Sequence, residues 1–317
     1  MPGRPTFFVA AAPRSGTTSL YSYLGQHPDI AMSAQKEPAY FHYRRLQPNF
    51  GELAELYGSE RKSESLRRHK RSISQAVVDP DAYSRLWDHH PHAGARGDAT
   101  PTYMYHLDAL HLIREEIPQA KLVLLLRNPV DRAYSQYLQY LRHGIETIYD
   151  FEAALDQEPI EVNDYWWGER RYLRIGKYAE HVENCIRLFG QDNLLILMTE
   201  EFESHPTTTV GKAVGFLGLT PFDGVDDSIR HKRAFVPRPS LSVRAARTRG
   251  PAKRLGRVFV PASVRKRLYQ RIMTRRVITP PPLLVSTRER LNEYFSSDIH
   301  ELEHLIDRDL SSWLEKN

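Results

Sequence analysis

The chain has 317 residues, 41% of them hydrophobic, and a single cysteine, so it can bury a core but cannot form an internal disulfide. No apolar run approaches the roughly 18–20 residues of a membrane span, so we expect a cytoplasmic protein. The net charge of +5 is unevenly distributed along the chain. Residues 230–276 hold 16 Lys and Arg with no Asp or Glu, and removing these charges leaves the rest at −11. This segregation indicates an anionic partner near one face, with a solvated surface as an equal alternative.

Short apolar runs alternate with amphipathic segments along much of the chain. The clearest is KLVLLLR at residues 121–127, which is apolar on both faces and ends at an Asn-Pro pair, as a buried strand does. Strands alternating with helices predict an α/β fold with a parallel sheet. In chain order we expect a strand at 6–12, a helix at 17–25, strands at 30–33 and 121–127, helices at 133–142 and 178–189, and a strand at 193–199.

Two polar segments interrupt this alternation. Residues 44–94, with the cluster RKSESLRRHKR, are predicted to be an insertion over one face. Residues 230–282 form a basic variable segment that ends in TPPP, which cannot be helix interior. Residues 287–314 carry apolar side chains at helical spacing and are predicted to form a pair of C-terminal helices. Because no internal repeat is found, we expect residues 1–317 to form a single domain.

The sequence PRSGTTSL at residues 13–20 joins the first predicted strand to the first helix. At such a junction the free amides and the positive end of the helix dipole face a bound anion. Gly16 lets the backbone approach a phosphate, and Arg14 adds a fixed charge. The ATP-binding motif GxxxxGK[ST] differs, because Thr17 stands where that motif needs lysine. The structural alternative is an ordinary helix start capped by Ser15 or Thr17.

This loop resembles the 5′-phosphosulfate-binding loop of sulfotransferases that use 3′-phosphoadenosine 5′-phosphosulfate (PAPS). The resemblance implies a P-loop-like parallel sheet flanked by helices, here with a helical C-terminal extension. Relatives usually carry Lys at the place of Arg14, beside the leaving phosphate. Since arginine has no readily lost proton, we expect Arg14 to stabilise charge rather than to act as an acid. The resemblance assigns six residues of this loop to the cofactor: Arg14, Ser15, Gly16, Thr17, Thr18 and Ser19.

A second phosphate motif follows the clearest strand. The sequence RNPVDRAYS places Arg127 at a strand's carboxyl end and Ser135 in the next helix, so the two can converge on one phosphate. The pattern RxPxxRxxS resembles the 3′-phosphate site of the same family, where Arg127 and Ser135 would hold the phosphate that distinguishes PAPS. Arg132 is predicted to make a structural salt bridge. A chance match to both phosphate motifs in this order is not expected.

The sequence KEPAYF at residues 36–41 carries the candidate catalytic base. Sulfuryl transfer to a hydroxyl needs a base for the acceptor proton. From the residues alone, an exposed Lys–Glu pair before a turn is the favoured interpretation. The segment resembles the KEPxFF element of bacterial and carbohydrate (heparan sulfate-type) sulfotransferases, which implies Glu37 as the catalytic base and Lys36 as a contact to the sulfuryl group or acceptor. His42 and His106 match no such motif.

Three weaker matches support the resemblance. GDATPTY at residues 97–103 is similar to a family segment that ends a strand and lines the acceptor cleft, and IGKYAEH at 175–181 is similar to a family helix start. HKRAF at 231–235 falls where relatives have a basic loop over the 3′-phosphate and adenine. That position implies Lys232 and Arg233 as further cofactor contacts.

The resemblance implies a sulfotransferase that moves a sulfuryl group from PAPS to a hydroxyl of a carbohydrate or glycolipid, with no metal required. The alternative is a P-loop small-molecule kinase, which would need the missing lysine and leaves Arg127 and Ser135 without a role. A basic, non-catalytic binding protein would have no reason to carry two phosphate motifs. We expect no nucleic-acid partner. The basic, amphipathic residues 251–277 can contact an anionic membrane, guide an acidic acceptor or pack on the enzyme.

Overall fold

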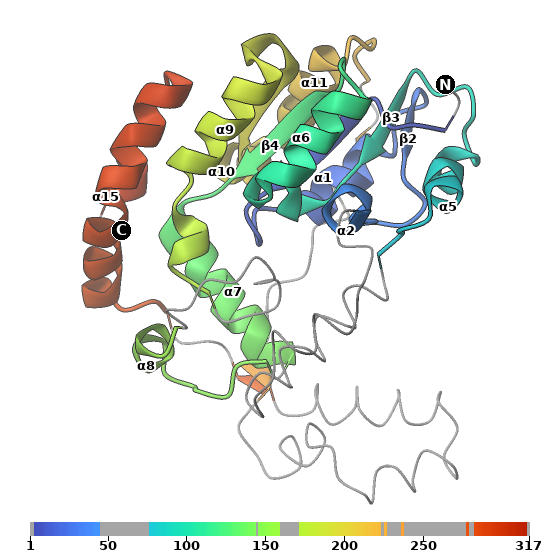
Figure 1. Cartoon of the computed structure of the whole chain (residues 1–317). Helices are drawn as coiled ribbons and strands as arrows, with labels where there is room; N and C mark the ends of the chain where they lie inside the picture. Colours follow the sequence, from blue (N-terminus) through green and yellow to red (C-terminus); the bar gives the residue numbers. More distant parts are fainter. Residues whose placement is uncertain are drawn as a thin grey trace, which may run out of the picture.

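A five-stranded parallel sheet, in the order β2-β3-β1-β4-β5, forms the centre of the fold (Figure 1). The computed structural model describes residues 3–44, 76–143, 145–158, 171–222, 225–226, 236–237, 277–278 and 282–315. The strands of the sheet are β1 (Phe7–Ala11), β2 (Ile30–Met32), β3 (Ala95–Asp98), β4 (Lys121–Leu126) and β5 (Leu194–Met198).

Helices cover both faces of the sheet, so its central strands are buried on both sides. Successive side chains of a strand point to opposite faces. In β1, Phe7 and Val9 join one apolar cluster, while Phe8 and Ala10 join the other, and all four are 0% exposed. The first face is covered by α1 (Thr17–Leu24) and α11 (Pro206–Phe216), and the second by α6 (Leu107–Glu116), α9 (Ala179–Phe189) and α15 (Val285–Ile306).

The order of the strands brings four loops to one edge of the sheet. The chain passes from β1 outward to β2, returns to β3 beside β1, and then crosses to β4 on the other side of β1. Parallel strands end at the same edge, and ligands of open α/β sheets bind where the direction of winding reverses. The segments after β1, β2, β3 and β4 therefore meet at the carboxyl edge, next to β1.

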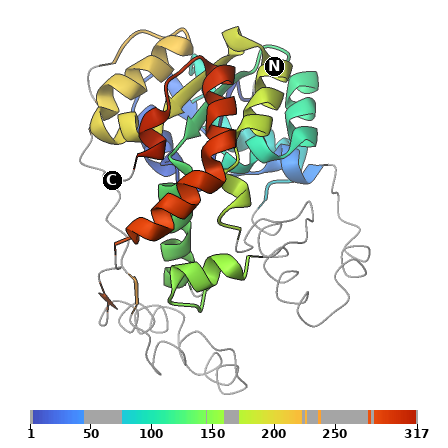
Figure 2. The same cartoon turned by 90° about the vertical axis from the view of Figure 1, so that its left-hand side faces the viewer.

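A long helix, α7 (Pro129–His143), leaves this edge and runs away from the sheet (Figure 1). The first residue of α8 (Phe151–Asp156) packs against the middle of α7, where the Phe151 ring lies 4.9 Å from the Tyr137 ring. Figure 2 shows α15 lying across the molecule toward α7. Two polar contacts fasten the C-terminal segment to the start of α7. Asn128 Nδ2 donates to the Trp313 carbonyl oxygen at 3.0 Å, and Arg288 Nη2 pairs with Asp131 Oδ1 at 2.6 Å.

The predicted fold class is confirmed, and each predicted strand is present with its ends shifted by a residue or two. Where a pair of C-terminal helices is predicted, the structure has α15 and a short 3-10 turn at Ser311–Leu314. The sequence analysis did not predict β3, α6 or α11. The remaining short elements are α2 (Tyr40–Arg44), α5 (Pro80–Ser84), α10 (Thr199–Ser204), β6 (Val236–Pro237) and β7 (Val277–Ile278).

Several interior residues clarify the sequence predictions. Tyr83 and Trp87 belong to the core, so the described part of the predicted insertion 44–94 contributes to it, while residues 45–75 lie outside the described residues.

Cys185 is fully buried, and burial raises the pKa of its thiol to about 12, which suits a small core side chain. None of the helices in the described ranges has the length and apolarity of a bilayer-spanning segment.

Candidate active site

The loop after β1 turns through two residues with a left-handed backbone. Arg14 has a φ of 75° and Gly16 a φ of 89°. The Ser15 amide donates to the Ala12 carbonyl oxygen at 3.2 Å, which closes the turn. Helix α1 then begins at Thr17, with Gly16 in the capping position and no side-chain cap. The structure therefore does not show the ordinary start capped by Ser15 or Thr17.

Groups from other elements hold this loop from outside. Arg127 Nη1, just after β4, donates to the Arg14 carbonyl oxygen at 2.9 Å. Thr199 Oγ1, at the start of α10, lies 2.8 Å from the carbonyl oxygens of both Ser15 and Leu126. These contacts occupy the carbonyl oxygens of Arg14 and Ser15 and none of the loop's amide groups.

The inner side of the loop offers hydrogen-bond donors without partners. Within the described ranges, the amides of Gly16, Thr17 and Thr18 donate to no group. Ser15 is fully buried, and its Oγ has no hydrogen-bond partner there either. A buried hydroxyl without a partner is rare in native proteins and calls for a ligand or a water molecule. Together with the positive end of the α1 dipole, these donors form a cradle for an anion.

The two phosphate motifs meet at this cradle. Arg14 Nε donates to Ser135 Oγ at 3.1 Å, across 121 residues of sequence. Arg142 lies two helical turns beyond Ser135 on α7. Burial, then the nearby Arg127 and Arg142, lower the pKa of the Arg14 guanidinium, although its outer side stays open to solvent. Arginine remains charged in proteins, so Arg14, Arg127 and Arg142 together place three positive charges here, which a bound anion would offset.

Replacing Gly16 with alanine should destabilise the protein by about 1–2 kcal/mol, because a left-handed backbone is unfavourable for residues with a Cβ. The new Cβ would find room, since its nearest neighbour, Phe202 Cδ1, lies at 3.5 Å. Urea unfolding measures the change. The matched control is Gly215→Ala in α11, where nothing lies within 4 Å and alanine should be neutral or stabilising. Equal stability of both variants would show that the loop does not need the left-handed conformation.

The segment after β2 carries Lys36 and Glu37 in an unusual backbone conformation. Glu37 and Ala39, on either side of Pro38, have φ values of 59° and 53°, which residues other than glycine rarely adopt. Lys36 Nζ and Glu37 Oε1 form an ion pair, and 41% of the Glu37 side chain is exposed. Such strain persists only where the surroundings impose it, and it concentrates at functional sites. The predicted base is therefore held in place while staying accessible to an acceptor.

Asp98, the last residue of β3, lies fully buried at the same edge. Its Oδ1 accepts a hydrogen bond from Thr100 Oγ1 at 2.7 Å. Its Oδ2 accepts from the hydroxyls of Tyr83 at 2.7 Å and Tyr103 at 3.1 Å. Burial raises the pKa of Asp98 to about 6, the three hydrogen bonds oppose the rise, and the nearby Glu37 adds to it. The resemblance placed Asp98, Thr100 and Tyr103 in a segment that lines the acceptor cleft, but it assigned them no role in the reaction, and Tyr83 was not predicted at all.

Two histidines lie on the flank of this region. The rings of His42 and His106 are 3.8 Å apart between centroids. Burial, with His181 nearby, lowers the pKa of His106 to about 4, so this side chain is neutral at physiological pH. A pKa of about 4 is close to that of an ordinary carboxylate, so His106 has no advantage in basicity over Glu37.

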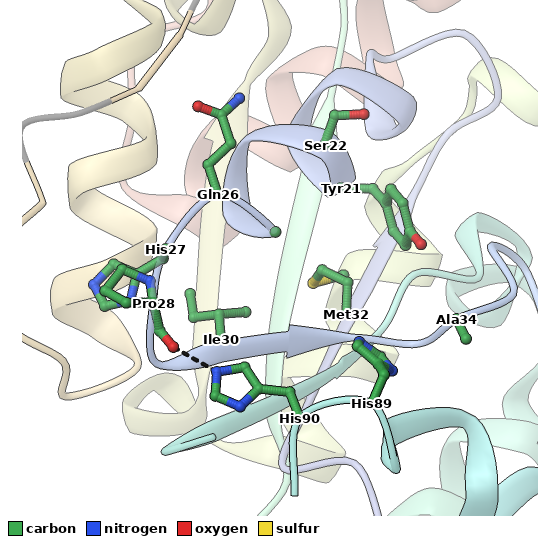
Figure 3. Close-up of a pocket in the computed structure, with 11 residues that line it drawn as sticks. Tyr21, Ser22, Gln26, His27, Pro28, Ile30, Met32, Ala34, His89 and His90 are labelled. Carbon is green, nitrogen blue, oxygen red and sulfur yellow. Dashed lines mark hydrogen bonds between the residues drawn. The ribbon is translucent and has the colours of Figure 1, made fainter. Parts of the chain in front are cut away.

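A pocket of about 600 Å³ lies beside β2, between the sheet's outer edge and the second half of α1 (Figure 3). Tyr21 and Met32 face it, and His90 Nε2 contacts the Pro28 carbonyl oxygen at 2.5 Å on its wall. Its lining reaches Ala34, two residues before Lys36, but includes none of the predicted site residues.

Supporting residues of the phosphate motifs were missed or differ from expectation. Tyr178 donates its hydroxyl to the Arg127 carbonyl oxygen at 3.0 Å, a role that its similarity to a family helix start did not reveal. Arg132 is fully buried and has a structural role, as predicted. Among the described residues, however, it forms hydrogen bonds to Gln136 Oε1 and the Tyr172 carbonyl oxygen instead of the expected salt bridge.

Other predicted contacts cannot be placed. Lys232, Arg233 and residues 251–276 of the predicted membrane-contact segment 251–277 lie outside the described residues. In the part of the chain that the structure describes, no group of three or more His, Cys, Asp or Glu side chains is arranged to hold a metal ion.

Comparisons with known proteins agree on one family. The chain is 25% identical to mouse carbohydrate sulfotransferase 15 over 263 residues, which covers 72% of this chain and 46% of that protein. It is 27% identical over 232 residues to mouse heparan sulfate glucosamine 3-O-sulfotransferase 6, covering 69% of this chain and 54% of that protein. The chain thus spans about half the length of these curated relatives.

A solved structure shares the whole fold. The sulfotransferase from Alicyclobacillus acidocaldarius is 27% identical, with a TM-score of 0.66 over 98% of this chain and 99% of that one. The model of the sulfotransferase family matches residues 5–224, a span that holds both phosphate motifs and the KEPAYF segment. The chain therefore belongs to the sulfotransferase family, a family of enzymes.

Proposed function

We propose that this protein transfers a sulfuryl group from PAPS to an acceptor hydroxyl. The observation that carries the proposal is the 3.1 Å contact between Arg14 Nε and Ser135 Oγ, because it joins the two phosphate motifs at one edge of the sheet. A nucleotide with phosphate groups on both its 5′ and 3′ positions needs two neighbouring cationic sites. Guanidinium groups suit both, since they bind phosphate oxygens through paired hydrogen bonds.

The residues present fit that nucleotide. The open amides of the α1 N-terminus and the unpartnered Ser15 Oγ suit the 5′-phosphosulfate. Arg127 and Ser135 suit the 3′-phosphate, and Lys232 with Arg233 remain predicted contacts. When bound, PAPS supplies the activated sulfuryl group and a 5′-phosphate that can leave.

Each residue of the site has a separate role in the transfer. Glu37 takes the proton of the acceptor hydroxyl while the acceptor oxygen bonds to sulfur and the bond from sulfur to the 5′-phosphate oxygen breaks. Arg14 and the α1 amides stabilise the negative charge that grows on the departing phosphate. Lys36 is placed beside Glu37 to contact sulfuryl or acceptor oxygens. Because these basic groups carry the charge, we expect no metal to be required.

A carbohydrate hydroxyl is the acceptor that the relatives favour, since the proteins that the chain resembles include carbohydrate and heparan sulfate sulfotransferases. A glycolipid would present the same kind of hydroxyl. The basic residues 230–276 suit an acidic acceptor through long-range attraction. A P-loop kinase is the less favoured function, because Thr17 occupies the position of its phosphate-binding lysine.

Thermal unfolding with three nucleotides tests the proposal without an acceptor. Adenosine 3′,5′-bisphosphate at about 100 times its dissociation constant should raise the free energy of unfolding by about 2.7 kcal/mol. Adenosine 5′-phosphate should bind more weakly by about 2–4 kcal/mol, because it lacks the charged group that Arg127 and Ser135 would hold. ATP should also stabilise less.

Ser135→Ala should reduce the preference for the bisphosphate, whereas Ser204→Ala, which loses only a contact within α10, should keep it. Equal stabilisation by the bisphosphate and adenosine 5′-phosphate would contradict the 3′-phosphate site. Preferential stabilisation by ATP would favour the kinase.

A further inference from the structure

A buried hydrogen-bond network links Asp98 to the backbone that carries Glu37. Thr100 Oγ1, which donates to Asp98, accepts the Ala39 amide at 3.2 Å. The Tyr103 hydroxyl, which also donates to Asp98, accepts the Phe41 amide at 3.3 Å. Two hydroxyl groups thus connect one carboxylate to two amides just after Glu37.

The carboxylate sets the direction of both links. A hydroxyl has one hydrogen, and an ionised carboxylate can only accept hydrogen bonds. While Asp98 is ionised, Thr100 and Tyr103 point their hydrogens toward it, and their lone pairs remain available to the amides of Ala39 and Phe41. An asparagine amide at this position would itself donate through two hydrogens, either toward Thr100 or toward both Tyr83 and Tyr103. Thr100 or Tyr103 would then have to reverse, which weakens its hold on the backbone amide.

We propose that Asp98 is a positioning residue for the transfer reaction: through Thr100 and Tyr103 it holds the left-handed turn that presents Glu37. The inference rests on the proposed role of Glu37 as the base. The carbonyl side of the same peptide unit is fastened separately, because the Val77 amide donates to the Pro38 carbonyl oxygen at 2.8 Å. The peptide unit between Pro38 and Ala39 is therefore held on both sides, and Asp98 governs the side of the Ala39 amide.

The surroundings of Asp98 favour such a role over simple stabilisation of the fold. The titratable groups that face it are Tyr83, Tyr103 and Glu37, and no cation is among the causes of its raised pKa of about 6. A folded-state pKa above the unfolded value means that this group stabilises the fold when protonated and loses that contribution as pH rises to about 6. The ionised form is thus kept at neutral pH despite a cost to stability, a pattern typical of functional sites.

Hydrogen exchange of the full-length protein tests the network without any acceptor. At neutral pH, Tyr103→Phe should expose the Phe41 amide, and Asp98→Asn should expose the Ala39 or the Phe41 amide, with exchange roughly tenfold faster or more. The matched control is Tyr83→Phe, which removes a hydroxyl from the same Asp98 oxygen but has no link to these amides. It should leave their protection unchanged.

A second arm measures transfer from PAPS to heparan sulfate and the binding of adenosine 3′,5′-bisphosphate. Asp98→Asn and Tyr103→Phe should lower kcat by roughly tenfold or more, with binding unchanged, whereas Tyr83→Phe should stay within about twofold. Thr100→Ser, which keeps the hydroxyl, should retain most of the activity.

The outcomes separate this inference from the function on which it rests. If Tyr83→Phe and Tyr103→Phe have equal effects on exchange and turnover, Asp98 is only a structural residue. If Glu37→Gln is inactive but Asp98→Asn keeps wild-type exchange and turnover, the inference alone is overturned. If the bisphosphate does not bind, the proposed function fails, whatever the exchange data show. If Glu37→Gln is fully active, the base lies elsewhere, and Asp98 has no base to position.

Discussion

Replacing Glu37 with glutamine should lower turnover by about 10²–10⁴-fold while leaving the binding of adenosine 3′,5′-bisphosphate nearly unchanged. Glutamine keeps the shape of the side chain but cannot accept the acceptor's proton. The fold should tolerate the change, because the ion pair with Lys36 is partly exposed and such pairs contribute at most about 1 kcal/mol. The loss should therefore appear in kcat, measured as sulfuryl transfer from PAPS to a panel of carbohydrate acceptors.

The control for this experiment is Glu301→Gln, an exposed change on α15, which should leave turnover and stability as they are. Turnover of Glu37→Gln close to that of the wild-type protein would move the base elsewhere. The candidates would then be His42, Asp98 and His106. Among them, Asp98 is disfavoured by its complete burial, which keeps an acceptor hydroxyl from reaching it.

The parts of the fold that depend on local pattern were predictable. Runs such as that of β4 are apolar on both faces, which only a strand buried on both sides requires. The cradle at Gly16 was also predictable, because a strand, a glycine and a row of hydroxyl residues before a helix imply open amides. The shared carboxyl edge then follows from a parallel sheet, and it brings the two phosphate motifs together.

Features that depend on distant contacts could not be predicted. The sequence of β3, ARGD, has charged residues at two of four positions, and its burial depends on partners elsewhere. Gly97 accepts the Phe7 ring so closely that an added Cβ would lie 2.4 Å from it. Asp98 receives one of its three hydroxyl donors from Tyr83, which lies in the segment predicted as an insertion. Sequence spacing carries no signal for such contacts.

The direct contact between the two phosphate motifs is a further feature of this kind. A shared edge predicts that Arg14, Arg127 and Ser135 lie near one another, but not which groups touch. In the structure Arg14 is central: its carbonyl oxygen accepts from Arg127 and its guanidinium donates to Ser135. The residue assigned to the leaving phosphate therefore also sets the geometry of the predicted 3′-phosphate site. Changes at Arg14 should affect both sites.

Replacing Arg14 with methionine should lower turnover by about 10²–10³-fold, because a preorganised charge at the leaving phosphate is lost. The binding of adenosine 3′,5′-bisphosphate, measured by calorimetry, should weaken as well. Arg14→Lys should retain turnover to within roughly tenfold, since the positive charge remains although the contact to Ser135 is lost.

The left-handed backbone of Arg14 affects both variants alike, so it does not distort the comparison between them. Arg187→Met on α9, where the side chain only contacts Asn184 at the surface, controls for the loss of a positive charge elsewhere and should behave as the wild-type protein. If Arg14→Lys is as inactive as Arg14→Met, the guanidinium matters for its hydrogen bonds rather than its charge. Full activity of Arg14→Met would show that the α1 amides stabilise the leaving phosphate without it.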